Sequence, residues 1–248
     1  MTQTRVDTVA RLTLEAGNFA PAGKTRADTI KVRALTDFYR TFHYDAVGLS
    51  SRELLFGVDM WKEAARDGMP VLAANLFKDK RGKKPLFQPF IVKEDHGSRF
   101  GIIGFVSESA WKARSDTTAK VYFRSPFAQE KLIRKVAKKC DHLTVLGEFT
   151  TLEADSLIRL FPDINVVVAS GVRADQVTRV GNALIVGAST RGNYASYVDW
   201  NYSPGDTALT YVNKAQVLDP TVPEDTTVVR LLGQMNEKIK TPAASVNP

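Results

Sequence analysis

Cysteine is the scarcest reactive residue in this chain of 248 residues, with Cys140 as its single copy. An intrachain disulfide and a cysteine-based zinc site are therefore excluded. Histidine is nearly as scarce, and the spacing of His43, His96 and His142 matches no metal-ligand motif. We assign each of the three histidines a structural or surface role.

Long apolar runs are also missing. No stretch approaches the roughly 18 to 20 apolar residues that span a bilayer, so we predict no transmembrane segment. Residues 1–15 alternate charged and apolar side chains and contain no signal-peptide core. The composition, 44% hydrophobic and 25% charged, is typical of a globular domain with a sizeable core. We predict one domain over residues 1–240 and a flexible tail, or a linker to a further segment, over 241–248.

Negative charge is in deficit, since 34 lysines and arginines stand against 27 aspartates and glutamates, a formal net charge of +7. Such a balance favours anionic partners, although a solvated surface with extra lysine is the simpler explanation. The basic residues cluster at 78–84 (KDKRGKK), an expected exposed turn, and at 131–139 (KLIRKVAKK), an expected solvent-facing helix. Neither cluster is interleaved with aromatic residues, so we predict no nucleic-acid partner.

Short apolar segments alternate with amphipathic segments along the first two thirds of the chain. Helices are predicted at 28–42, with Asp28 as the N-cap, and at 59–66, 125–140, 151–161 and 226–240. Strands are predicted at 9–15, 44–49, 71–76, 87–93, 99–106, 143–146, 165–169, 183–187, 194–202 and 209–217, with residues 50–53 as a loop. This alternation predicts a layered α/β fold.

Six segments also follow the motif order of one known family. They are 44–57 (YDAVGLSSRELLFG), 69–76 (MPVLAANL), 87–90 with 99–105, 161–168 (FPDINVVV), 182–187 (NALIVG) and 192–195. In this order and spacing they resemble the N-terminal catalytic domain of secreted 5′-nucleotidases, a branch of the calcineurin-like metallophosphoesterases. The resemblance covers about residues 9–217 and implies a four-layer α/β/β/α sandwich.

The resemblance fails at the positions that bind metal in that family. There, a D-x-H motif, a G-D pair, the N-H of G-N-H-E, a later histidine and a G-H-x-H motif hold two divalent cations. These cations clamp the phosphate and generate a hydroxide nucleophile. In this sequence no D-x-H strand precedes residues 12–15. The other positions read Gly17-Asn18, Ser51-Arg52, Gly147-Glu148 and, at 170–173, SGVR. Only Glu53, the non-ligating glutamate of G-N-H-E, is retained.

The substituted residues are poor metal ligands. Arginine is permanently cationic and has no lone pair to donate, so Arg52 and Arg173 would repel a divalent cation. Asn18, Ser51 and Glu148 supply only one carboxylate and weakly ligating neutral oxygens. We therefore predict no dinuclear metal site and no cofactor, and we take these five residues as the candidate site.

Two interpretations of this site stay open. In the first, Arg52 and Arg173 pair with Glu148 and Glu53, and the former pocket closes. In the second, the two arginines face a cleft and bind a phosphate or nucleotide anion without hydrolysing it, since the guanidinium fork suits phosphate.

The function predicted from these departures is that of a degenerate, non-catalytic 5′-nucleotidase-like domain with a structural or protein-interaction role. A protein partner or a fused neighbouring domain is expected with it. The alternatives are an active metal-dependent phosphoesterase with an unrecognised ligand set, or a non-hydrolysing nucleotide- or anion-binding module. The resemblance implies a periplasmic or extracellular location, because nucleotidases of this branch are typically exported.

Overall fold

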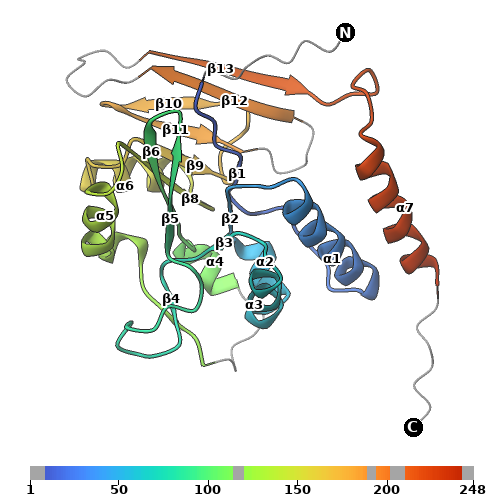
Figure 1. The fold of residues 1–248 in the computed structure, drawn as a ribbon. Coiled ribbons are helices and arrows are strands. Elements are labelled where there is room, and N and C mark those ends of the chain that lie inside the picture. Colours follow the sequence, from blue (N-terminus) through green and yellow to red (C-terminus); the bar gives the residue numbers. More distant parts are fainter. Residues whose placement is uncertain (1–8, 114–119, 189–193, 202–209, 242–248) are drawn as a thin grey trace.

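Two β-sheets lie face to face in the computed structural model, which describes residues 9–113, 120–188, 194–201 and 210–241 (Figure 1). The first sheet is parallel and contains β1 (Leu14–Glu15), β2 (Ala46–Gly48) and β3 (Val71–Leu72). The second sheet has six strands in the order β10 (Val177–Val180), β11 (Ala183–Gly187), β9 (Val166–Ala169), β8 (His142–Gly147), β6 (Ser98–Gly104) and β5 (Phe90–Asp95). Its four inner strands are parallel, and the two outer strands run antiparallel to their neighbours.

The alternation of side chains along the strands explains why the sheets stack. In β2 and β3, Ala46 and Leu72 face the second sheet, where they meet Ile102 and Leu146. The intervening residues of the same strands point the other way, into a core shared with helices. Gly104 permits the close approach, because a Cβ atom at this position would lie 2.4 Å from the carbonyl oxygen of Leu72.

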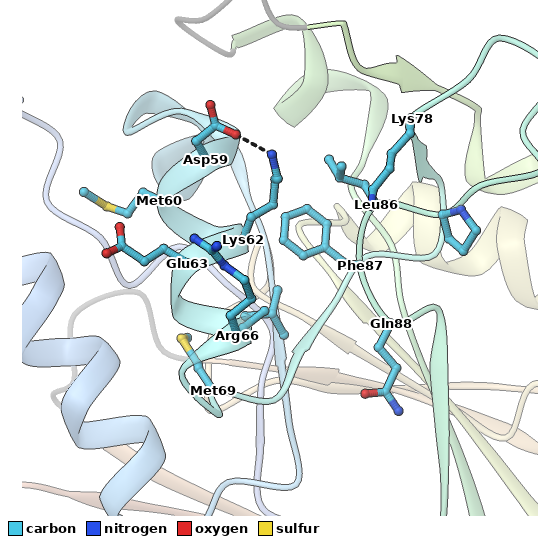
Figure 2. A pocket seen from close by; sticks show the side chains of 13 residues that line it. Asp59, Met60, Lys62, Glu63, Arg66, Met69, Lys78, Leu86, Phe87 and Gln88 are labelled. Atoms are coloured by element: carbon cyan, nitrogen blue, oxygen red, sulfur yellow. Dashed lines mark hydrogen bonds and ion pairs between the residues drawn. The ribbon is translucent and has the colours of Figure 1, made fainter.

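Helices cover the outer face of the first sheet. They are α1 (Arg26–Thr41), α2 (Ser51–Leu55), α3 (Val58–Arg66) and α4 (Glu108–Ala113), and they pack around the fully buried Trp61. The outward face of α3 carries Asp59, Lys62 and Arg66 and faces the segment 78–88 (Figure 2). That segment follows β4 (Leu76–Phe77), which pairs with β7 (Tyr122–Phe123).

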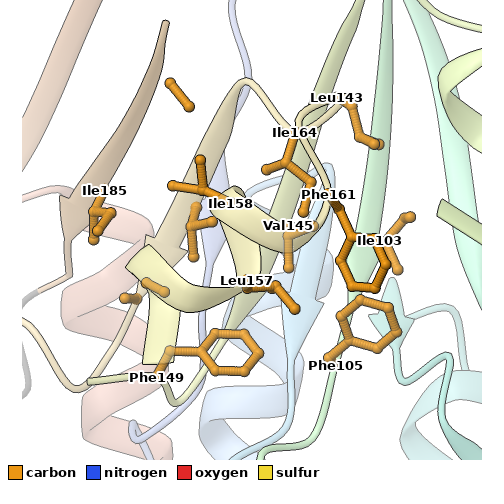
Figure 3. Close-up of a cluster of buried hydrophobic side chains, with 14 of the residues drawn as sticks. Ile103, Phe105, Leu143, Val145, Phe149, Leu157, Ile158, Phe161, Ile164 and Ile185 are labelled. Atoms are coloured by element: carbon orange, nitrogen blue, oxygen red, sulfur yellow. The ribbon is translucent and has the colours of Figure 1, made fainter. Parts of the chain in front are cut away.

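A second helical layer covers the six-stranded sheet. It consists of a short 3₁₀ helix (Pro126–Ala128), α5 (Glu130–Ala137) and α6 (Thr151–Leu160). Residues such as Phe105, Val145, Leu157 and Ile185 fill the core beneath it (Figure 3). The order of layers is therefore helices, three-stranded sheet, six-stranded sheet and helices, which confirms the predicted four-layer α/β/β/α sandwich.

The C-terminal part of the chain adds a hairpin and a helix. The hairpin of β12 (Tyr194–Asn201) and β13 (Thr210–Val217) packs Val198 and Trp200 onto the six-stranded sheet. Helix α7 (Thr226–Lys240) lies beside α1 (Figure 1). The Arg26 guanidinium donates hydrogen bonds to three carbonyl oxygens at the end of α7, those of Lys238, Ile239 and Thr241. None of the helices in the described ranges is long and apolar enough to cross a membrane.

Several predicted boundaries are wrong. The N-cap of α1 is Thr25, and Asp28 is the third residue of the helix. These two residues form a capping box, in which the side chain of each accepts the backbone N–H of the other. Residues 50–53 are not a loop, because α2 begins at Ser51 with Ser50 as its N-cap. The predicted helix 125–140 is split at Gln129. Elements β4, β7, β10 and α4 were not predicted.

The predicted strand 71–76 is wrong as a single strand, because its two ends belong to β3 and β4, which lie in different sheets. Of the predicted strand 9–15, only residues 14–15 form a strand. The remaining predicted elements lie within a few residues of their observed bounds, and those of β11 and α7 are identical to them. Residues 202 and 209 of the predicted strands, the motif residues 192–193 and the tail 242–248 lie outside the described residues.

Candidate functional site

The loops that follow the parallel strands meet at one edge of the two sheets. Residues 16–20 follow β1 and residues 49–53 follow β2, whereas 147–149 and 170–173 follow β8 and β9 of the second sheet. Ligand sites of α/β proteins form at this end of the strands. All five candidate residues lie on these four segments: Asn18, Ser51, Arg52, Glu148 and Arg173.

The residues that follow β1 and β2 surround the carboxylate of Glu53, which is not among the five predicted site residues. The Glu53 side chain is fully buried. Its Oε2 atom accepts the backbone N–H groups of Asn18 at 2.8 Å and Ser50 at 2.9 Å, and also the Ser50 hydroxyl. Its Oε1 atom accepts the N–H groups of Phe19 at 3.1 Å and Ala20 at 2.8 Å. Four backbone donors and a hydroxyl therefore surround one carboxylate.

The loop around Glu53 depends on two left-handed residues. Gly17 has φ of +96° and Asn18 has φ of +72°, a region that glycine and asparagine tolerate best. Successive N–H groups then turn toward one point and form an anion-binding concavity, or nest. Here the nest holds a carboxylate of the same chain, so its three N–H groups are not available to an external phosphate.

Glu15 lies next to this nest. Its Oε1 accepts the Gly17 N–H at 3.1 Å, and its Oε2 accepts the Tyr39 hydroxyl at 3.2 Å. Burial, followed by the charge of Glu53, raises the pKa of Glu15 to about 7. Burial and the nearby Glu15 also raise the pKa of the Tyr39 hydroxyl, which stays protonated. A carboxyl group with this pKa exchanges protons at neutral pH, but both of its oxygens are already hydrogen-bonded inside the protein.

Ser51 and Glu148 join the two sheets across the site. The Ser51 N–H donates to Glu148 Oε2 at 2.7 Å, and the Ser51 hydroxyl donates to Glu148 Oε1 at 2.9 Å. These bonds link the start of α2, which follows β2, to the loop after β8. Both oxygens of Glu148, the only carboxylate among the five candidates, are thereby engaged.

The two arginines do not reach these carboxylates. The Arg52 guanidinium donates to the Ala20 carbonyl oxygen at 3.4 Å. Arg173 is 74% exposed and forms a two-pronged ion pair with Asp175, with Nε–Oδ1 at 3.0 Å and Nη2–Oδ2 at 2.6 Å. This pair raises the pKa of Arg173 and lowers the pKa of Asp175.

The interpretation in which Arg52 and Arg173 pair with Glu148 and Glu53 is therefore wrong. Four backbone N–H groups and the Ser50 hydroxyl already surround Glu53, and each oxygen of Glu148 accepts a hydrogen bond from Ser51. Within the described ranges, no hydrogen bond or ion pair connects the two arginines to each other. The structure brings Ser51 and Glu148 together and leaves Arg173 on the surface.

The residues present do not fit the two divalent cations that the resemblance implies. Such a centre needs several carboxylate or imidazole ligands with free lone pairs. The candidate residues offer the amide of Asn18, the hydroxyl of Ser51, a single carboxylate, that of Glu148, which already accepts two hydrogen bonds from Ser51, and two cationic arginines. In the part of the chain that the structure describes, no group of three or more histidine, cysteine, aspartate or glutamate side chains is arranged to hold a metal ion.

The histidines lie away from the site. His43 precedes β2, at the opposite end of the strand from residues 49–53, and His96 lies in the turn between β5 and β6. His142 begins β8, where it stacks on Phe100 with ring centroids 5.3 Å apart. Burial lowers the pKa of His142, which favours the neutral ring. All three positions agree with the predicted structural or surface roles.

The fold is that of metallophosphoesterase domains in solved 5′-nucleotidases. The 5′-nucleotidase precursor of Thermus thermophilus superimposes with a TM-score of 0.76 at 20% identity over 93% of this chain. Sulfate thiohydrolase SoxB of Thermus thermophilus gives 0.76 at 16% identity, and a 5′-nucleotidase of Staphylococcus aureus, itself described as putative, gives 0.70 at 17%. This chain covers 50%, 42% and 49% of those three chains, respectively.

A sequence relation accompanies the fold. The chain is 30% identical over 101 residues to a 5′-nucleotidase of Vibrio parahaemolyticus, which is 40% of this chain and 18% of that protein. No family model matches the chain. The molecule therefore has the calcineurin-like metallophosphoesterase fold of 5′-nucleotidase N-terminal domains and is a distant relative of those proteins.

The sequence did contain a signal for the nest around Glu53. Ser50 and Glu53 have the S-x-x-E spacing of a capping box, in which each side chain bonds the other residue's backbone N–H. That pattern marks the start of a helix and places the Glu53 carboxylate at its N-terminus. The resemblance to G-N-H-E indicates only which metal ligands are lost and does not predict this role of Glu53.

Proposed function

We propose that this chain is a non-catalytic 5′-nucleotidase-like domain that serves a structural or protein-interaction role in a larger exported protein or assembly. One observation carries the proposal. The two carboxylates at the ends of β2 and β8 are bonded internally, Glu53 by four backbone N–H groups and Glu148 by Ser51.

Phosphoester hydrolysis needs an activated nucleophile as well as positive charge on the phosphate. The arginines at the site can supply only the charge, and Asp175 already neutralises Arg173. Glu15 has a pKa suited to proton transfer, but Gly17 and Tyr39 occupy its oxygens. The site therefore lacks a group that would generate hydroxide, which supports a binding or structural role.

The test combines turnover with metal binding. Purified protein is incubated with p-nitrophenyl phosphate and with nucleoside 5′-monophosphates in the presence of Mn²⁺, Zn²⁺ or Mg²⁺, and its melting temperature is followed with each metal. We expect no turnover above the buffer blank and no metal-dependent stabilisation. Turnover that chelation removes, and that Glu148→Gln abolishes but the exposed-site control Glu224→Gln does not, would establish an active phosphoesterase and refute the proposal.

The same preparation tests the anion-binding alternative. Inorganic phosphate and adenosine monophosphate are added without metal, and the melting temperature is compared with that of the Arg52→Glu/Arg173→Glu double variant. We expect no stabilisation by either anion, because the nest is filled by Glu53. Stabilisation of the wild type that the double variant loses would favour a nucleotide-binding module.

A further inference from the structure

A groove of about 760 Å³ lies between α3 and the segment 78–88, away from the strand-end loops (Figure 2). Its lining is apolar at depth: Met69, Val71 and Phe87 are almost fully buried, and Met60 and Leu86 are half-buried beside them. Basic side chains line its rim, with Lys62 and Arg66 on α3 and Lys78 opposite. The groove thus combines an apolar floor with a charged border.

The basic turn 78–84 at this border is held in one conformation. The Asp79 carboxylate accepts the backbone N–H groups of Lys83 at 3.2 Å and Lys84 at 2.6 Å. The Lys78 N–H donates to the Lys84 carbonyl oxygen at 2.8 Å, and Arg124 donates to the carbonyl oxygen of Arg81. Because Asp79 is used to build the turn, the basic side chains around it are displayed from a fixed backbone.

Basic side chains outnumber acidic ones by a larger ratio in the groove and turn than in the chain as a whole. Seven basic side chains stand against three acidic ones: Lys62, Arg66, Lys78, Lys80, Arg81, Lys83 and Lys84 against Asp59, Glu63 and Asp79. The whole chain has 34 against 27. Asp59 is paired with Lys62 at 2.6 Å, and Asp79 is bonded to backbone N–H groups of the turn, so the repulsion of an incoming anion by these two carboxylates is reduced.

We propose that this groove binds an acidic, extended segment of a partner protein that inserts a large apolar side chain between α3 and Leu86. The inference rests on the proposed protein-interaction role and names the surface and the chemistry of the partner. Charge complementarity selects an acidic segment, and the apolar floor selects one with an apolar anchor. A nucleic acid fits less well, because the lining contains one aromatic ring, that of Phe87, and not the series of rings on which successive bases stack.

The probe is a fluorescein-labelled acidic peptide of about ten residues, long enough to cross the groove at about 3.3 Å per residue. Two peptides of equal length and charge are compared, one with leucine and phenylalanine among its glutamates and one with serine at those positions. Binding to the full chain is measured by fluorescence anisotropy. The variant Lys80→Glu/Lys83→Glu changes the turn. The variant Lys131→Glu/Lys138→Glu, at two exposed lysines of α5 and its C-cap, makes the same change in net charge elsewhere. Leu86→Gln changes the groove wall, and Leu160→Gln changes an exposed leucine of α6.

We expect the turn variant to weaken binding of the apolar-acidic peptide about tenfold and the α5 variant to weaken it less than about twofold. The serine peptide should bind the wild type about tenfold more weakly, and Leu86→Gln, unlike Leu160→Gln, should remove that difference.

Equal losses in both charge variants would show attraction to net charge alone and overturn the proposal. The proposal is also overturned if the two peptides bind equally, if no saturable binding occurs, or if a heparin fragment or anionic vesicles bind through the turn regardless of Leu86. Phosphoesterase activity would refute the proposed function without affecting these results, whereas peptide failure in an inactive protein would refute the groove alone.

Discussion

Replacing Glu15 by glutamine is expected to stabilise the protein at neutral and higher pH. The native pKa of Glu15 is raised from 4.5 to about 7, mainly by burial and then by Glu53. Each tenfold change in an ionisation constant corresponds to about 1.4 kcal/mol, so ionised Glu15 costs about 3 kcal/mol of folding free energy above pH 7. Glutamine keeps an acceptor for Gly17 and carries no charge, so it avoids this cost.

The sign follows from proton binding. Between pH 4.5 and 7 the native state holds the Glu15 proton more tightly than the unfolded state does, so stability falls as the pH rises through this range. Urea unfolding of Glu15→Gln and wild type should therefore differ by less than about 1 kcal/mol at pH 5 and by about 3 kcal/mol at pH 8. Glu224→Gln, in an exposed loop, serves as the control and should show no such dependence. A gain that is absent at pH 8, or the same at both pH values, would refute the placement of a buried, charge-coupled carboxyl beside Glu53.

Three further changes test the packing. Glu53→Ala leaves four N–H groups, two of them in buried and two in part-buried bonds, without their acceptor and is expected to cost about 3–5 kcal/mol in urea unfolding; a loss below about 1 kcal/mol would contradict the nest. Gly104→Ala drives a Cβ atom against Leu72 and should lower the melting temperature, whereas Gly233→Ala, in open space on α7, should raise it slightly; the reverse order would contradict the close contact of the sheets. Leu157→Ala opens a cavity in the core under α6 and should cost about 2–5 kcal/mol, which calorimetry can measure.

Much of the fold was predictable because its strands are short, apolar and regularly separated. The runs at 165–169 and 183–187 have the continuous apolar character of buried parallel strands, and both become inner strands of the large sheet. The strand β10 was missed because its sequence, VTRV, is short and half polar, as suits a sheet edge. Helix α2 was missed because it is only five residues long and begins directly after the strand 44–49, where residues 50–53 are predicted as the connecting loop.

The site was less predictable because it depends on backbone direction and on how the sheets are placed. The ion pair of Arg173 with Asp175 spans two residues and was visible in the sequence. The bond between Ser51 and Glu148 joins residues 97 positions apart, and no local pattern specifies it. The nest around Glu53 requires positive φ at Gly17 and Asn18. Glycine and asparagine can adopt positive φ, but their presence in a sequence does not require it.

The bond between Ser51 and Glu148 also makes the Ser51 amide a local reporter of sheet separation. Exchange of this amide hydrogen with deuterium requires its bond to the Glu148 side chain to open, as it does when the start of α2 parts from the loop after β8. Amides within either sheet are protected by their own strand neighbours and do not need this parting. Slow exchange at Ser51, comparable with that of Val145 in the second sheet, would mean that the two halves of the sandwich open as one cooperative unit. Faster exchange would mean that the halves can separate while each keeps its own strands intact.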